Sequence, residues 1–254
     1  MGTKIEGVVP LSITTQMAAF KSGLKFEEKV AARLRQLSYA GVPITCIKTA
    51  GGGSGPDVPF KAGENSMCME AKTKGAFEGG QKVFKFVDGV LTLPPDSVHK
   101  SILGDYVPFK GVIPPFLQKK ITLHEWLEVK NNFQGEYAPT NATNLVANYY
   151  NSKGSKYIQI EGLGLYRTSE EDPLELGVPL LECNTKFRIR CKQHKGKIPS
   201  SVMCSLTYNK KSIKKSPYDI MYDERLPPGL TVLPAESEPQ TTPSSHSSHT
   251  PTPP

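Results

Sequence analysis

Asp57, Glu70 and Lys72 are the residues of this sequence whose types and spacing best suit a chemical reaction. Twelve residues separate Asp57 from Glu70, and Lys72 follows Glu70 after one further residue. Two carboxylates held side by side suit a hard divalent cation, which prefers oxygen ligands. Such a cation polarises a phosphoryl oxygen and lowers the pKa of a bound water, and a nearby ammonium offsets charge that develops in the transition state. The three residues therefore predict phosphodiester hydrolysis.

Two neighbouring strands are expected to bring these side chains together. One strand is expected over residues 57–61 and the next over residues 67–72, with a turn at 63–66 between them. This turn would place Asp57 beside Glu70. Side chains alternate between the two faces of a strand. In the second strand one face would carry Cys68, Glu70 and Lys72, and the other Met67, Met69 and Ala71.

An amphipathic helix from Gly23 to Ala40 is expected to precede these strands, and Gly41-Val42-Pro43 would end it. Glu27 lies at the edge of its apolar stripe, whereas Glu28 points further towards solvent. The stripe consists of residues at helical spacing, namely Phe26, Val30, Leu34 and Leu37. A strand over residues 44–49 and the glycine-rich loop at 51–55 would connect this helix to Asp57.

The remaining two thirds of the chain give weaker secondary-structure signals. We expect surface loops from Leu91 to Pro115, which is rich in proline. Residues 83–90 fit either a strand or a short helix, and residues 123–129 fit a helix. Further strands are expected at 156–167, with a glycine-marked bend, at 187–192 and at 201–208.

Two short motifs in this order resemble the restriction-endonuclease-like superfamily, the PD-(D/E)xK nucleases. Pro56-Asp57 matches the PD element, and Glu70-Ala71-Lys72 matches the (D/E)xK element. The helix that carries Phe26-Glu27 resembles the first core helix of the family, which often adds a metal-binding acid. Glu27 matches that acid best, and Glu28 is the second match. The resemblance covers about residues 23–90.

The resemblance implies an α/β fold, a central mixed sheet flanked by helices, to which a β-rich C-terminal part is added here. It implies Mg²⁺, with Mn²⁺ as a substitute, bound by Glu27, Asp57 and Glu70. Asp57, Glu70 and Lys72 would be catalytic. Gln81, which resembles a polar position that some members carry beyond the lysine, would join them. The usual substrate of the family is DNA, and a homodimer is one form in which the chain could act.

A basic segment lies in the C-terminal half of the chain. The formal net charge is +7, and between Cys183 and Tyr218 there are ten Lys or Arg residues and no Asp or Glu. Such runs either solubilise a surface or contact phosphates. Phe187 to Lys192 alternates apolar and cationic residues, which predicts a half-buried strand. Its outward-facing Arg188, Arg190 and Lys192 are candidates for binding nucleic acid.

Two other motifs are weaker candidates for chemistry. The five cysteines form no CxxC pair, and their odd number favours reduced thiols over a disulfide framework. A zinc site built from Cys183, Cys191, His194 and Cys204 would have a spacing that matches no common zinc module. The GGGSG segment lacks the Lys-Ser or Lys-Thr and the following helix of a P-loop, so it does not predict a nucleotide site.

Three alternatives to a restriction-like endonuclease stay open. A Holliday-junction resolvase or another structure-specific nuclease would share the fold and the metal site. A non-catalytic DNA-binding protein would use the basic segment alone, and the acidic residues would then be incidental. An enzyme that acts on RNA is a third option, because basic strands with aromatic residues also stack bases.

Composition and length set the broad class and the expected domains. The chain has 254 residues and is 37% hydrophobic, which supports a folded core. It has no apolar run long enough to span a membrane and no signal-peptide pattern, so we expect an intracellular protein. We expect an N-terminal arm at 1–15, a nuclease domain at 16–222 and a disordered tail rich in Pro, Ser and Thr at 223–254.

Overall fold

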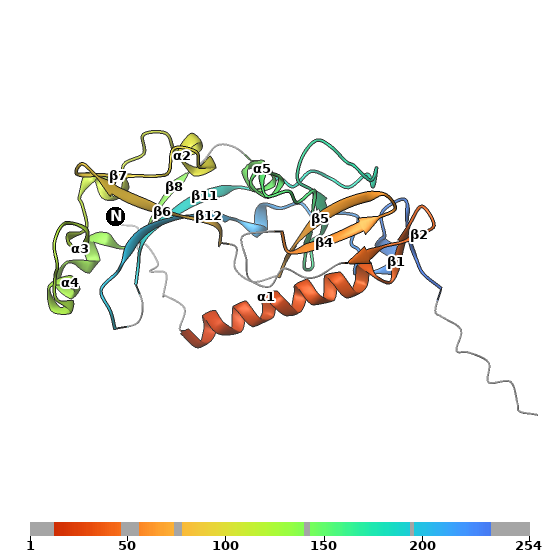
Figure 1. The fold of residues 1–254 in the computed structure, drawn as a ribbon, viewed down its shortest axis with the longest axis horizontal. Helices are drawn as coiled ribbons and strands as arrows, with labels where there is room; N and C mark the ends of the chain where they lie inside the picture. Colours follow the sequence, from red (N-terminus) through yellow and green to blue (C-terminus); the bar gives the residue numbers. More distant parts are fainter. Residues whose placement is uncertain (1–12, 47–55, 74–77, 140–142, 194–195, 235–254) are drawn as a thin grey trace, which may run out of the picture.

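The computed structural model describes residues 13–46, 56–73, 78–139, 143–193 and 196–234 (Figure 1). Two five-stranded sheets and one small three-stranded sheet make up its β structure, and helices pack on them. The protein is therefore a mixed α/β protein, as expected. Within the described residues, no helix is both long enough and apolar enough to span a membrane.

The first sheet carries the candidate catalytic residues and has the strand order β10-β9-β5-β4-β3. Its strands are β3 (Thr45–Cys46), β4 (Val58–Ala62), β5 (Asn65–Lys72), β9 (Tyr157–Ile160) and β10 (Gly164–Arg167). β4 and β5 form an antiparallel hairpin whose turn contains Gly63 at a φ of +60°, a conformation that suits glycine. β5 and β9 are parallel, so the sheet is mixed.

Helices cover both faces of this first sheet. Helix α1 (Ile13–Leu34) packs on one face, where Phe26, Val30 and Leu34 form a core cluster with Val58 and Met69. Helix α5 (Leu145–Ser152) contributes Val146, Ala147 and Tyr150 to a second core cluster, which includes Ile158 and Ile160 of β9. Neighbouring residues of β9 point to opposite faces, so α5 lies on the side of the sheet opposite α1.

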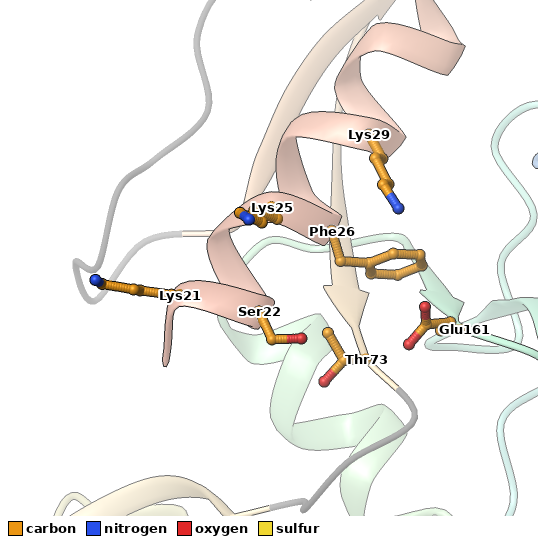
Figure 2. Close-up of a pocket in the computed structure, with 7 residues that line it drawn as sticks. All are labelled: Lys21, Ser22, Lys25, Phe26, Lys29, Thr73 and Glu161. Atoms are coloured by element: carbon orange, nitrogen blue, oxygen red, sulfur yellow. The ribbon is translucent and has the colours of Figure 1, made fainter. Parts of the chain in front are cut away.

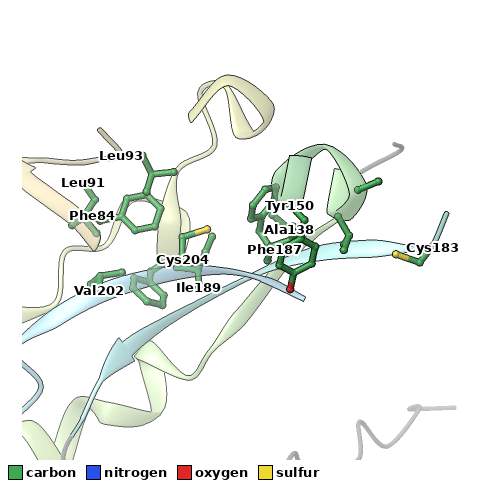
Figure 3. Close-up of a cluster of buried hydrophobic side chains, with 14 of the residues drawn as sticks. Phe84, Leu91, Leu93, Ala138, Tyr150, Cys183, Phe187, Ile189, Val202 and Cys204 are labelled. Carbon is green, nitrogen blue, oxygen red and sulfur yellow. The ribbon is translucent and has the colours of Figure 1, made fainter. Parts of the chain in front are cut away.

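The second sheet is antiparallel and has the strand order β7-β6-β12-β11-β8. Its strands are β6 (Glu78–Val87), β7 (Val90–Thr92), β8 (Glu136–Pro139), β11 (Thr185–Lys192) and β12 (Ser201–Tyr208). One face packs Phe84, Phe187, Ile189 and Val202 into the second core cluster (Figure 3). Helices α2 (Val98–Leu103), α3 (Pro115–Gln118) and α4 (Leu123–Val129) lie at the end of the molecule where β6 and β7 also lie (Figure 1).

Short 3-10 helices and the third sheet complete the fold. The 3-10 helices are η1 (Pro108–Gly111), η2 (Lys130–Phe133), η3 (Lys210–Ser212) and η4 (Asp223–Arg225). The third sheet has the order β13-β1-β2, formed by β1 (Leu37–Tyr39), β2 (Val42–Pro43) and β13 (Leu230–Val232). It joins the end of α1 to a segment almost two hundred residues later in the chain.

The expected boundaries of the first helix are wrong at both ends. α1 begins at Ile13, inside the expected N-terminal arm, and ends at Leu34 instead of Ala40. Leu37 is fully buried, as the helical spacing suggested, but it lies in β1 and pairs with Val232. Ala40 and Gly41 both have positive φ and form the turn into β2. A pairing with a distant strand therefore overrides the local helical periodicity.

The expected start of the disordered tail is also too early. Residues 223–225 form η4, and Leu230 of β13 is buried against the first core cluster. The backbone pairing with β1 orders this segment despite its low apolar content. Residues 235–254 lie outside the described residues, as do the glycine-rich loop at 51–55 and His194.

The other expectations are confirmed in part. The helix at 123–129 and the strand at 201–208 have the expected bounds. The ambiguous segment at 83–90 is a strand, β6, that turns into β7 at Asp88-Gly89. Helix α2 lies within 91–115, where only loops were expected, and Ser97 caps its first turn. The strand expected at 156–167 is a hairpin, because Gly162 (φ +75°) turns β9 back into β10.

Candidate active site

The β4–β5 hairpin places Asp57 directly across from Glu70. Val58 pairs with Met69 in the register, so Asp57, one residue before β4, lies opposite Glu70 of β5. Oδ2 of Asp57 accepts a hydrogen bond of 3.1 Å from the backbone N–H of Ala71, which fixes the carboxylate against β5. The structure thus brings Asp57 and Glu70 together through the tight hairpin that the sequence suggested.

Lys72 forms an ion pair with both of these carboxylates. Its Nζ lies 2.6 Å from Oδ2 of Asp57 and 2.7 Å from Oε2 of Glu70. Burial by itself lowers the pKa of Lys72, but Tyr150 and the carboxylates of Glu70 and Asp57 raise it above its usual value. Lys72 is therefore fully charged at neutral pH, and its one ammonium pairs with two carboxylates.

Glu70 is completely buried, and a second lysine holds its other oxygen. Oε1 accepts hydrogen bonds from Nζ of Lys153 at 2.9 Å and from Oγ of Ser155 at 3.2 Å. The ring of Tyr150 lies beside both ammonium groups, 5.2 Å from Nζ of Lys72 and 5.5 Å from that of Lys153. Two cations and an aromatic face thus fix the orientation of this buried carboxylate.

Lys153, Ser155 and Tyr150 were not found from the sequence. They come from the end of α5 and the turn into β9, and no helix was expected at 145–152. The pattern Leu-Val-Ala-Asn-Tyr-Tyr is apolar on one side, which is a usable helix signal. The parallel pairing of β9 with β5 is a long-range contact, however, and no local pattern reveals it.

Glu27 of α1 lies next to this group. Its side chain is half-buried, whereas that of Glu28 is exposed, as the helical spacing suggested. Burial raises the pKa of Glu27 to about 7, and repulsion by Asp57 and then by Glu70 adds to this rise. Oε2 of Glu27 is buried and has no hydrogen-bond partner within the described part of the chain. The three acidic residues named from the sequence therefore share one region of negative potential.

A divalent cation fits the donor set of this region, but only if Lys72 moves. Oε2 of Glu27 is buried without a hydrogen-bond partner among the described residues, and Oε2 of Glu70 is buried with the Lys72 ammonium 2.7 Å away. Carboxylate oxygens of this kind are the ligands that Mg²⁺ prefers. As the side chains are placed, however, the described residues contain no group of three or more His, Cys, Asp or Glu that could hold a metal ion. The Lys72 ammonium lies between Asp57 and Glu70 instead.

The remaining candidates lie in the second sheet. Gln81 is an exposed residue of β6 and is not among the residues that hydrogen-bond to Asp57, Glu70 or Lys72. Arg188, Arg190 and Lys192 alternate along β11 with Phe187, Ile189 and Cys191. Phe187 and Ile189 are buried, so the three cations lie on the opposite face, as expected.

The cysteines are free; Cys183 and Cys204 are buried, and the other three are half-buried. Burial raises the pKa of the Cys183, Cys191 and Cys204 thiols to about 12. These thiols are therefore protonated at neutral pH in the metal-free protein. Their surroundings favour a packing role in the second core cluster.

Searches of protein-family models, of curated proteins and of solved structures found no match to this chain. The function must therefore be inferred from the residues and geometry of the candidate active site.

Proposed function

We propose that this protein is a metal-dependent endonuclease that hydrolyses phosphodiester bonds in DNA. One observation carries the proposal: Asp57 and Glu70 converge on a single cationic group, at 2.6 and 2.7 Å, with the orphaned carboxylate of Glu27 nearby. Desolvating three acids together is unfavourable unless cations neutralise them. A site that binds a divalent cation and a phosphate explains why these residues are clustered.

The surrounding fold supports a restriction-endonuclease-like arrangement. The hairpin that carries Asp57 and Glu70 belongs to a mixed sheet, with α1 on one face and α5 on the other. A central mixed sheet flanked by helices is what the PD and ExK motifs imply. Glu27 lies on the first helix, where an additional metal-binding acid is expected in that family.

Asp57, Glu70 and Glu27 would hold the Mg²⁺ ion, for which Mn²⁺ could substitute. When bound, the ion lowers the pKa of a water ligand and polarises a phosphoryl oxygen. Lys72 would leave its position between the two carboxylates on metal loading, because two cations repel each other there. Its ammonium would then be free to neutralise charge that develops on the phosphate. Lys153 and Ser155 would continue to orient Glu70.

The basic face of β11 is the proposed surface for double-stranded DNA. Arg188, Arg190 and Lys192 project from the same side of this strand, and Tyr137 of β8, which pairs with Arg188, is exposed beside them. Arginine contacts phosphates and base edges, and the surrounding lysines add non-specific attraction. This face would position the duplex while the first sheet performs the reaction.

A non-catalytic DNA-binding protein is the second candidate. The observation in its favour is that Glu70 is fully buried and already neutralised by two lysines. In that case Asp57, Lys72 and Glu70 would form a structural ion-pair cluster, and only the basic face of β11 would be functional.

Metal-dependent cleavage separates these two candidates. The protein is incubated with supercoiled plasmid and, separately, with a four-way DNA junction, each with Mg²⁺, with Mn²⁺ and with EDTA. The nuclease proposal expects cleavage that depends on the metal. Cleavage of the four-way junction would show that the enzyme recognises the branched shape of the DNA. Binding without cleavage under all conditions would favour the non-catalytic candidate.

A further inference from the structure

A pocket of about 420 Å³ lies between α1 and the ends of two strands of the first sheet (Figure 2). Helix α1 lines it with Lys21, Ser22, Lys25, Phe26 and Lys29. Thr73 and Glu161 line it from the side of the sheet. None of these residues belongs to the candidate catalytic group, so the pocket is a separate feature of the surface.

This pocket adjoins the candidate active site along two elements. Thr73 directly follows Lys72 of β5, and Phe26 directly precedes Glu27 of α1. Glu161 follows the end of β9, and its backbone N–H donates a 2.8 Å hydrogen bond to the carbonyl of Lys72. The pocket therefore lies where the parallel strands β5 and β9 both end, and ligands of open α/β sheets bind at such carboxyl ends.

Three lysines and one acidic residue are among the described residues that line the pocket, so this lining carries a net positive charge. Lys21, Lys25 and Lys29 lie four residues apart, so they share one face of α1 at intervals of about 6 Å along its axis. All three are exposed, and within the described residues none of them forms an ion pair or a hydrogen bond. Like charges at this spacing destabilise a helix, and a bound polyanion would relieve that repulsion.

The polar groups of the pocket also suit a phosphate. Ser22 and Thr73 carry hydroxyl groups that can donate to phosphate oxygens, and Figure 2 shows the Ser22 side chain directed towards Thr73. Phe26 is almost fully buried, so its ring is not available to stack on a base. Among the described residues that line the pocket, Glu161 is the one with an acidic side chain, and three lysines outnumber it.

We propose that this pocket binds backbone phosphates of the DNA strand that enters the active site. The inference rests on the proposed function, because it takes the ligand to be the nuclease substrate. A strand seated there would lie at the end of β5, one residue beyond Lys72, and beside Phe26, which precedes Glu27 on α1. The pocket would thus position the substrate beside the metal ligands, independently of the basic face of β11.

Binding of a fluorescent DNA duplex in EDTA, measured across a series of KCl concentrations, tests this proposal. The variant Lys21→Ala/Lys25→Ala/Lys29→Ala is compared with Lys110→Ala/Lys119→Ala/Lys120→Ala. The control changes three exposed lysines in or near η1 and α3, outside the pocket lining, and removes the same charge. Each lost phosphate contact flattens the slope of log affinity against log salt by about 0.9, so the pocket variant should flatten it by roughly 1 to 3.

The control variant is expected to change the slope much less than the pocket variant. Glu161→Gln, which removes the opposing charge, is expected to tighten binding by roughly two- to fivefold, the effect of one surface charge. Equal slopes for the two triple variants would overturn the proposal, and so would weaker binding by Glu161→Gln.

Failure of the pocket proposal and failure of the nuclease proposal give different results. A parent protein that binds DNA through the pocket but never cleaves plasmid supports the pocket proposal and overturns the nuclease proposal. If the parent protein cleaves plasmid but the pocket variant has the same salt dependence as the control variant, only the pocket proposal is overturned. If the parent protein does not bind the duplex, the pocket proposal is overturned, whatever the result of the plasmid cleavage assay.

Discussion

Nζ of Lys72 lies 2.6 Å from Oδ2 of Asp57, so a lysine ammonium occupies the place between two carboxylates where a divalent cation would bind. Under the proposed function, lysine and metal would compete for Asp57. Lys72→Ala is expected to bind Mg²⁺ at least as tightly as the parent, and to lose cleavage by about 100-fold or more because the charge that stabilises the transition state is gone. Calorimetric titration with Mg²⁺ and a plasmid assay measure the two effects. Lost Mg²⁺ binding would show that Lys72 holds the carboxylates in position for the metal.

Glu70 should contribute to stability as well as to activity. Glu70→Gln leaves Lys72 and Lys153 without their shared carboxylate, and breaking a buried ion pair costs about 3–5 kcal/mol. Each lysine is still about one-fifth exposed, and Lys72 keeps Asp57, so we expect a loss of about 2–3 kcal/mol. Chemical denaturation in EDTA measures it.

Glu171→Gln is the matched control for that prediction. Glu171 pairs with Lys156 at 3.1 Å, but its side chain is 74% exposed. The same substitution there should change stability by no more than about 0.5 kcal/mol. Equal effects of the two substitutions would mean that the cluster around Glu70 does not stabilise the fold.

The raised pKa of Glu27 makes the stability of the metal-free protein depend on pH. Burial, with repulsion by Asp57, raises this pKa from 4.5 to about 7, so between these values the folded protein keeps a proton that the unfolded chain releases. The resulting stability is fully present below about pH 4.5 and is lost as the pH rises through about 7. Glu27→Gln in EDTA is therefore expected to raise Tm at about pH 8 and to leave it unchanged near pH 4.5.

The exposed neighbour Glu28 supplies the control for the pH experiment. Glu28→Gln should shift Tm by the same small amount at both pH values, because Glu28 lies on the solvent side of α1. A pH-independent effect of Glu27→Gln would place Glu27 outside the negative region around Asp57.

Two truncations test the corrected boundary of the C-terminal tail. Ending the chain before Leu230 removes β13 and the strand pairing of Leu37–Tyr39, so Tm should fall by several degrees. Ending it after residue 234 removes a segment that has few apolar residues, and Tm should stay the same. Equal melting temperatures for both truncations would mean that the third sheet adds nothing to stability.

Local sequence patterns predicted the parts of the fold that local geometry determines. The β4–β5 hairpin, the alternation of Met69 and Glu70 and the alternation along β11 all follow from period-two patterns and a short turn. The placement of Asp57 beside Glu70 and Lys72 follows from the same hairpin. This part of the site needed no long-range information.

Long-range pairings account for what the sequence did not reveal. Leu37 satisfies a helical spacing and a strand equally well, and only its partner Val232 decides between them. Lys153 reaches Glu70 because β9 runs parallel to β5 after a crossover of more than eighty residues. Gln81 lies only nine residues after Lys72, but β6 belongs to a different sheet and Gln81 is exposed on it.

The most direct test of the central proposal is plasmid cleavage by the parent and by Asp57→Asn, each with Mg²⁺ and with EDTA. The substitution removes a charged oxygen ligand at nearly constant volume, and Asp57 is less buried than Glu70, so the fold should survive. Near-UV circular dichroism and duplex binding in EDTA confirm that it does. We expect the parent to cleave the plasmid with Mg²⁺ but not with EDTA, and Asp57→Asn to be inactive in both. Cleavage by Asp57→Asn at the rate of the parent, or by the parent in EDTA, would contradict the proposed metal-dependent active site.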